Sequence, residues 1–154
     1  MTQNISELHV LVIFSCENGS VERLALQAAV GAVQARASIR LRRLTPEGVP
    51  QNQESQRMQQ DYIAPRAVDL DWADGVVVAI RGEEVSAFEG LAVSGKHAMT
   101  LRPCDTELRQ AGFVLFSIPQ DFNLLDPRDC CRAGRLFAEA MRTVTGPGAT
   151  GSTQ

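Results

Sequence analysis

Two short stretches of this sequence are apolar at nearly every position, and they limit the folds that the chain can adopt. Residues 8–15 read LHVLVIFS and residues 75–80 read GVVVAI. A run of strand length that does not alternate with polar residues is typical of a β-strand covered on both faces, as in parallel sheets. The two runs therefore predict central strands of an α/β fold, with helices packed on both sides.

The rest of the chain supplies the further elements that such a sheet needs. Residues 38–44 alternate apolar and cationic side chains, which predicts an edge strand whose arginines face solvent and block aggregation. Residues 96–101 and 113–118 complete a set of five predicted strands. Five alternating strands in a chain of 154 residues favour the doubly wound order 2-1-3-4-5, which is the flavodoxin-like order.

Capping residues mark the predicted helices. Ser20 caps a helix over residues 21–37, Gly112 ends a short one over residues 106–111, and Asp126 with Pro127 begins the last. The core stripe of the last helix is expected to consist of Ala133, Phe137, Ala140, Met141 and Val144. Only a short helix, of at most two turns around residues 85–93, is expected after the third strand.

This pattern predicts one domain over residues 1–145 and a disordered tail over residues 146–154. The polar, aperiodic residues 45–60 predict a mobile surface loop with a weak helix near residues 53–60.

Charge and composition narrow the function classes. The chain carries 15 Lys and Arg against 18 Asp and Glu, with both signs scattered, so we expect no nucleic-acid partner. No run approaches the roughly 20 apolar residues of a membrane span, and residues 1–7 lack the features of a secretion signal. These features predict a cytoplasmic protein without a membrane segment.

The cysteines and histidines give no sign of a metal or catalytic site. Cys16, Cys104, Cys130 and Cys131 show no C-x-x-C spacing, and a cytoplasmic location disfavours disulfides. His9 and His97 fall in predicted strands, with no Ser or Cys at motif spacing. We therefore expect free thiols, no metal site and no catalytic side chain.

A ligand of such a sheet binds beyond the carboxyl ends of the strands, where the strand order reverses. The candidate walls are residues 15–21, 81–85 and 102–105. The first wall joins a strand, a turn with Gly19 and a helix N-terminus, which together offer backbone N–H groups to a phosphate. It contains neither G-x-G-x-x-G nor G-x-x-x-x-G-K-[ST], which disfavours Rossmann and P-loop ligands.

Residues 10–25, VLVIFSCENGSVERLA, resemble the opening of the NAD(P)H-dependent FMN reductase and NAD(P)H:quinone oxidoreductase families, within the flavodoxin-like group. Those families follow an apolar strand with Tyr-Ser-Ser-Thr-Tyr-Gly-Asn-Thr and a helix, and Ser15, Gly19, Leu24 and Ala25 match that pattern. The resemblance implies bound FMN, with NAD(P)H as electron donor, a flavin or quinone as small-molecule partner, and a homodimer.

Several positions depart from the family pattern. Cys16, Glu17 and Val21 stand where the family offers hydroxyls to the FMN phosphate, and Glu17 adds an anion beside it. Residues 80–84 replace the family's Gly-Thr-Pro-type loop over the flavin ring. The candidate cofactor-binding residues are Ser15, Cys16, Glu17, Asn18, Gly19, Ser20, Val21, Arg81, Gly82 and Arg102.

Two functions stay open on the sequence. One is an FMN-binding redox protein of the reductase type with a weakened flavin site, in which Glu17 repels the phosphate. The other is a degenerate, flavin-free relative that serves as an interaction or structural protein. A receiver-type signalling domain of the same topology is disfavoured, because the strand ends lack its acidic residues and its lysine.

Overall fold

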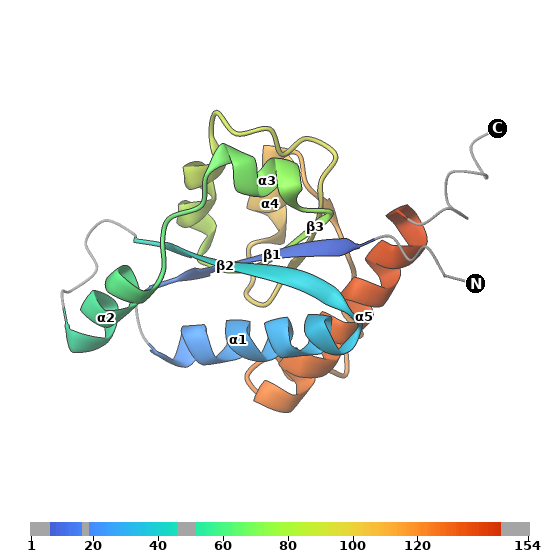
Figure 1. The fold of residues 1–154 in the computed structure, drawn as a ribbon, viewed down its shortest axis with the longest axis horizontal. Helices are drawn as coiled ribbons and strands as arrows, with labels where there is room; N and C mark the ends of the chain where they lie inside the picture. The colour runs from blue at the N-terminus through green and yellow to red at the C-terminus, as the bar shows by residue number, and fades with distance from the viewer. Residues whose placement is uncertain (1–6, 17–18, 46–51, 146–154) are drawn as a thin grey trace.

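The computed structural model describes residues 7–16, 19–45 and 52–145, and these contain one five-stranded sheet (Figure 1). The strands are β1 (Leu8–Ser15), β2 (Ala37–Leu44), β3 (Gly75–Ala79), β4 (His97–Thr100) and β5 (Val114–Leu115). All neighbouring strands pair in parallel, in the order β2-β1-β3-β4-β5. The predicted fold class and strand order are therefore confirmed.

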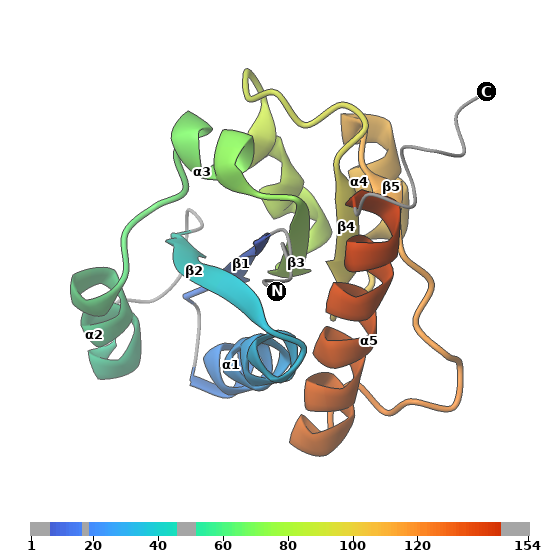
Figure 2. The same ribbon diagram turned by 45° about the vertical axis from the view of Figure 1, so that its right-hand side comes forward.

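Helices cover both faces of this sheet (Figures 1 and 2). The helices α1 (Gly19–Gln34) and α5 (Pro127–Thr145) lie side by side on one face. On the other face lie α3 (Ala67–Trp72), the 3₁₀ helix η1 (Gly82–Phe88) and α4 (Asp105–Ala111). The helix α2 (Gln53–Asp61) lies apart from these two layers, near the first turn of α1 and beyond the edge strand β2.

The two helical layers bury alternate residues of the same strands. Val10, Val12 and Phe14 of β1 belong to the apolar core beneath α1 and α5, whereas Leu11 and Ile13 belong to the core beneath α3 and α4. This alternation explains why the strand is apolar throughout, since each residue faces one of two cores.

The helices α1 and α5 approach each other closely because of two glycines. A Cβ atom at Gly31 would overlap the backbone carbonyl of Cys131, and one at Gly134 would overlap that of Ala28. Glycine in a helix interior costs about 1 kcal/mol relative to alanine, so these positions are explained by the close contact of the two backbones.

Several predicted boundaries need correction. The helix α1 begins at Gly19 and ends at Gln34, and β5 spans two residues instead of the predicted 113–118. The short helix after β3 is η1, which begins and ends earlier than the predicted 85–93. Val144 is 44% exposed, so it lies outside the core stripe that the other four residues of α5 form.

The predicted weak helix near residues 53–60 is present as α2, and Met58 in it is fully buried. Part of the segment that the sequence predicts as a mobile surface loop therefore contributes a side chain to the core. Residues 46–51 of that segment and the tail over residues 146–154 lie outside the described residues.

The arginines of β2 do not form the predicted solvated edge. Asp69 of α3 is fully buried, and its carboxylate accepts hydrogen bonds from Arg40 at 3.0 Å and from Arg42 Nε at 2.8 Å. Burial works to raise the pKa of Asp69, but the bonds from Arg42, the Arg66 backbone and Arg40 outweigh it and hold the pKa below its usual value. The prediction of a solvated edge is wrong because Asp69 of α3 pairs with Arg40 and Arg42 of the edge strand β2.

We expect Phe137→Ala to lower the free energy of unfolding by about 3 to 5 kcal/mol, because it deletes a fully buried ring and leaves a cavity. The ring packs edge to face with Phe116, and a Cβ at Gly75 would lie 2.8 Å from it. Denaturant titration measures the change. The control Val144→Ala, on the same helix but exposed, should stay within about 0.5 kcal/mol of the parent. A loss below about 1 kcal/mol for Phe137→Ala would contradict this packing.

Asp69→Asn should destabilise the fold by about 3 kcal/mol, since it leaves the mostly buried guanidinium of Arg42 without its counter-charge. Because the pKa of Asp69 is lowered on folding, its contribution is present above about pH 4 and is lost as the pH falls through the folded pKa. Unfolding measured from neutral to acidic pH should show a steeper acid loss in the parent than in the variant. The exposed Asp71→Asn on the same helix is the control, and identical pH profiles for parent and Asp69→Asn would contradict the assignment.

Candidate functional site

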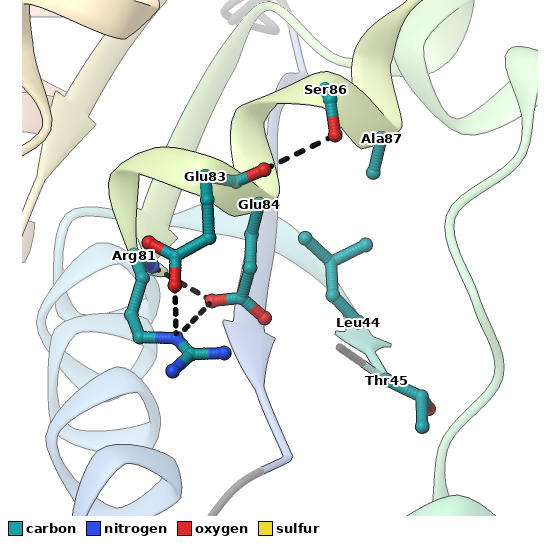
Figure 3. Close-up of a pocket in the computed structure, with 7 residues that line it drawn as sticks. All are labelled: Leu44, Thr45, Arg81, Glu83, Glu84, Ser86 and Ala87. Atoms are coloured by element: carbon teal, nitrogen blue, oxygen red, sulfur yellow. Dashed lines mark hydrogen bonds and ion pairs between the residues drawn. The ribbon is translucent and has the colours of Figure 1, made fainter. Parts of the chain in front are cut away.

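The strand order reverses between β1 and β3, and a pocket lies at the carboxyl ends of the strands there. Its volume is about 460 Å³, and we name it the switch-point pocket. It is lined by Leu44, Thr45, Arg81, Glu83, Glu84, Ser86 and Ala87. Figure 3 shows the end of β2 on one side of it and the first turns of η1 on the other. Its position is the one at which doubly wound proteins bind their ligands.

Ser15, the last residue of β1, is fully buried beside this pocket. It pairs in register with Leu44, which forms part of the pocket wall, so both side chains lie on the same face of the sheet. The Ser15 hydroxyl finds no hydrogen-bond partner among the described residues. A buried polar group in this state is usually satisfied by a water molecule or a ligand.

Cys16 follows Ser15 and is buried on the opposite side of the chain. Its backbone N–H donates to the carbonyl of Leu44 at 2.9 Å, and its thiol lies 3.4 Å from Oγ1 of Thr45. These contacts extend the pairing of β1 with β2 by one residue, which gives Cys16 a structural part at the rim of the site.

Charge in the switch-point pocket is dominated by an arginine held between two acids (Figure 3). Nε of Arg81 lies 3.4 Å from Glu83 and 3.8 Å from Glu84, and the Arg81 backbone N–H donates to Glu84 at 2.7 Å. The side chain of Glu84 is almost fully buried, whereas that of Glu83 is exposed. The guanidinium is thus directed toward carboxylates of its own helix, and this wall carries one more negative than positive charge.

The N-terminus of α1 already binds a carboxylate. The backbone N–H of Gly19 donates to Oε1 of Glu54 at 3.2 Å, and a Cβ at position 19 would lie 2.7 Å from the other carboxylate oxygen. Backbone N–H groups at a helix N-terminus favour anions, and glycine allows the anion to approach closely. A side chain of α2 therefore stands where the sequence predicts a phosphate.

Glu22 holds α2 in this position. Its carboxylate accepts hydrogen bonds from Arg57 of α2 at 3.1 Å and from the hydroxyl of Tyr62 at 2.7 Å. The hydrogen bond from Arg57 holds the pKa of Glu22 below its usual value, while burial and the neighbouring Glu22 raise the pKa of Tyr62 to about 12. At neutral pH the cluster therefore holds an ionised carboxylate and a protonated phenol.

The predicted site residues fall into three groups. Ser15, Cys16, Gly19, Ser20 and Val21 lie at the end of β1 and in the first turn of α1, and Arg81 and Gly82 lie at the start of η1. Arg102 lines a different cavity, of about 650 Å³, beyond β4 and β5. Glu17 and Asn18 lie outside the described residues.

Two acids at the site were not predicted from the sequence. Glu54 follows Gly19 by 35 residues in the sequence, although the two are hydrogen-bonded. Glu107 of α4 would lie 2.9 Å from a Cβ at Gly82. The capping box of Asn52 with Ser55 marks the start of α2, which places Glu54 in its first turn. No local signal indicates which helix Glu54 contacts.

The four cysteines are free thiols, and Cys104 and Cys130 are buried. Burial raises the pKa of Cys104, and it raises that of Cys130 to about 11, so neither forms a reactive thiolate near neutral pH. Within residues 7–16, 19–45 and 52–145, no three His, Cys, Asp or Glu side chains come together as metal ligands. No helix in the same ranges is long and apolar enough to cross a membrane.

Comparison with known proteins gives likeness in structure but not in sequence. No family model matches the chain, and no curated protein sequence matches it. A diflavin flavoprotein A3 from Nostoc sp. superposes with a TM-score of 0.60 at 15% identity, over 90% of this chain and 96% of that one. An archaeal flavodoxin superposes with a TM-score of 0.57 at 13% identity, over 88% of this chain and 99% of the flavodoxin.

A variant of a flavo di-iron protein from Thermotoga maritima is similar over 88% of this chain, at 13% identity and a TM-score of 0.59. This chain covers 37% of that longer protein. At these identities the likeness establishes architecture, and it agrees with the strand order observed. The chain therefore has the flavodoxin-like fold.

Proposed function

We propose that this chain is a flavodoxin-like redox protein that binds FMN at the carboxyl edge of its sheet, with an affinity weakened by its own acidic side chains. The observation that carries the proposal is the bond from the Gly19 N–H to the carboxylate of Glu54, because it marks a working anion site at the start of α1. The flavoproteins among the structural neighbours support the same ligand class.

The residues present fit the phosphate end of FMN. The backbone N–H of Gly19 lies at the positive end of α1, a helix of 16 residues, and already donates to a carboxylate. The buried hydroxyl of Ser15 offers a further hydrogen bond at the same strand end. The switch-point pocket includes Leu44, the register partner of Ser15, and has a volume within the range of small-molecule sites.

A bound flavin would supply the electron and hydride transfer, and this chain would bind and orient it. The described residues around the switch-point pocket include no side chain placed as a nucleophile–base pair, so we assign no catalytic residue. From the family resemblance we propose NAD(P)H as electron donor, a quinone or free flavin as acceptor, and a homodimer in the cytoplasm.

Acidic side chains weaken the proposed site. Two like charges about 5 Å apart repel by about 3 kcal/mol at an effective dielectric constant near 20, and salt and exposure reduce this to about 1 to 3 kcal/mol. The sequence assigns this effect to Glu17, and the structure adds Glu54, which must leave Gly19 before a phosphate can bind there.

A flavin-free interaction or structural protein is the second candidate. The contacts that weaken the first proposal favour it, because Glu54 occupies the N-terminus of α1 and Arg81 is directed toward Glu83 and Glu84. Under this alternative the internal ion pairs replace the cofactor contacts and hold the same loops together.

Glu54→Gln should tighten FMN binding by about five- to twentyfold, because it removes the charge but keeps an amide oxygen for the Gly19 N–H. Riboflavin, which lacks the phosphate, should change by less than about twofold. Quenching of flavin fluorescence in titrations of both ligands measures the two affinities. The gain for FMN should shrink as salt rises.

Glu139→Gln on the exposed side of α5 is the matched control, and it should leave both affinities unchanged. Glu17→Thr removes the acid that the sequence predicts to repel the phosphate. Comparing it with Glu54→Gln separates the effects of the two acids on FMN binding. If neither the parent protein nor Glu54→Gln binds FMN at high micromolar concentration, the flavin-free alternative replaces the first proposal.

A further inference from the structure

A second cavity lies at the same edge of the sheet, beyond β4 and β5. Its volume is about 650 Å³, and it shares no described lining residue with the switch-point pocket. We name it the β5 hollow. Its lining comes from residues 100–103, Asp105 and Arg109, and from residues 115–118, Gln120, Phe122, Leu124 and Leu125. Figure 2 shows the chain between β5 and α5 making a wide excursion beside α5.

Apolar and polar side chains both line the β5 hollow. The large apolar ones are Leu101, Leu115, Phe116, Ile118, Phe122, Leu124 and Leu125. Phe116, Ile118, Phe122 and Leu124 are half-buried against the core beneath α1 and α5, and Leu125 is 83% exposed. Apolar side chains gathered around a concave surface favour a ligand with an apolar body.

Contacts with α5 fix these walls in place. The Asn123 N–H donates to Asp129 at 2.8 Å, and the thiol of Cys130 donates to the carbonyl of Leu124 at 3.3 Å. The guanidinium of Arg132 lies 4.4 Å from the ring centre of Phe122. The excursion is thus tied down at three successive points, although it has no regular secondary structure.

Arg109 lines the β5 hollow and brings a positive charge to it. Its guanidinium makes no ion pair or hydrogen bond with any residue that the structure describes. Among the described lining residues Arg102 is a second cation and Asp105 an acid, so the lining carries one net positive charge. The whole chain has a net charge of -3, and the switch-point pocket wall is negative.

We propose that the β5 hollow binds a small amphiphilic carboxylate, with its apolar body against Phe116, Phe122 and Leu124 and its carboxylate on Arg109. A guanidinium presents parallel N–H groups that match the two oxygens of a carboxylate. The proposal is independent of flavin binding, because it uses other residues and a different ligand.

The test uses octanoate and octanol, two probes with the same chain length, in ¹H–¹⁵N NMR titrations of the full chain without flavin. Octanoate should shift the amide signals of residues 100–109 and 115–125 and should bind more tightly than octanol. Arg109→Gln should weaken octanoate by about five- to tenfold and leave octanol unchanged, since it removes only the charged hydrogen bonds. Arg135→Gln, an exposed arginine on α5 outside the hollow, is the matched control and should change neither.

Three results would overturn the proposal. The first is the absence of shifts around the β5 hollow at millimolar octanoate, and the second is an unchanged preference for octanoate in Arg109→Gln. The third is a dimer in sedimentation that Leu125→Asp dissociates while octanoate fails to bind, which would make the hollow a contact between copies of the chain.

Discussion

The close contact of α1 with α5 is the constraint on which the rest of this structure depends. Gly31 and Gly134 let the two backbones meet where any larger side chain would overlap a carbonyl group, and alanines at positions 28 and 32 of α1 continue the contact. The cost of glycine in a helix interior is about 1 kcal/mol at each position. The pair then covers one face of the sheet. The first turn of α1, where Gly19 binds Glu54, belongs to a helix that this contact holds in place.

Prediction from the sequence succeeded where the local pattern carries the physical cause. Apolar runs mark buried strands because both faces of the sheet are covered, and Gly112, with a φ of 112°, ends α4 because its backbone is left-handed. It failed where a distant partner decides. The pattern of Arg40 and Arg42 predicts a solvated edge, but Asp69 of α3, far along the chain, binds both arginines. Of the candidate site, the strand end and helix start were predictable, whereas Glu54 was not.

Two cavities of opposite charge share one edge of the sheet. The start of α1 attracts anions, whereas Glu54 beside it and the acids of the switch-point pocket repel them, so the affinity for a phosphate depends on which contribution is larger. The β5 hollow combines the guanidinium of Arg109 with apolar side chains, and its two arginines outnumber its one acid, Asp105. The fold thus offers the same strand ends for two different chemistries, and the side chains of the loops distinguish them.

The edges of the sheet restrict how copies of this chain can associate. The backbone N–H of Arg43 donates to the carbonyl of Ile63 at 3.0 Å, so the segment after α2 covers β2 from outside. At the opposite edge β5 presents two residues, too few for a stable intermolecular ladder. An added strand would therefore meet the segment at Ile63 on one edge and a two-residue strand on the other. Helix faces offer another surface for self-association, and Val30 and Val33 of α1, each about half exposed, are apolar side chains placed one helical turn apart on such a face.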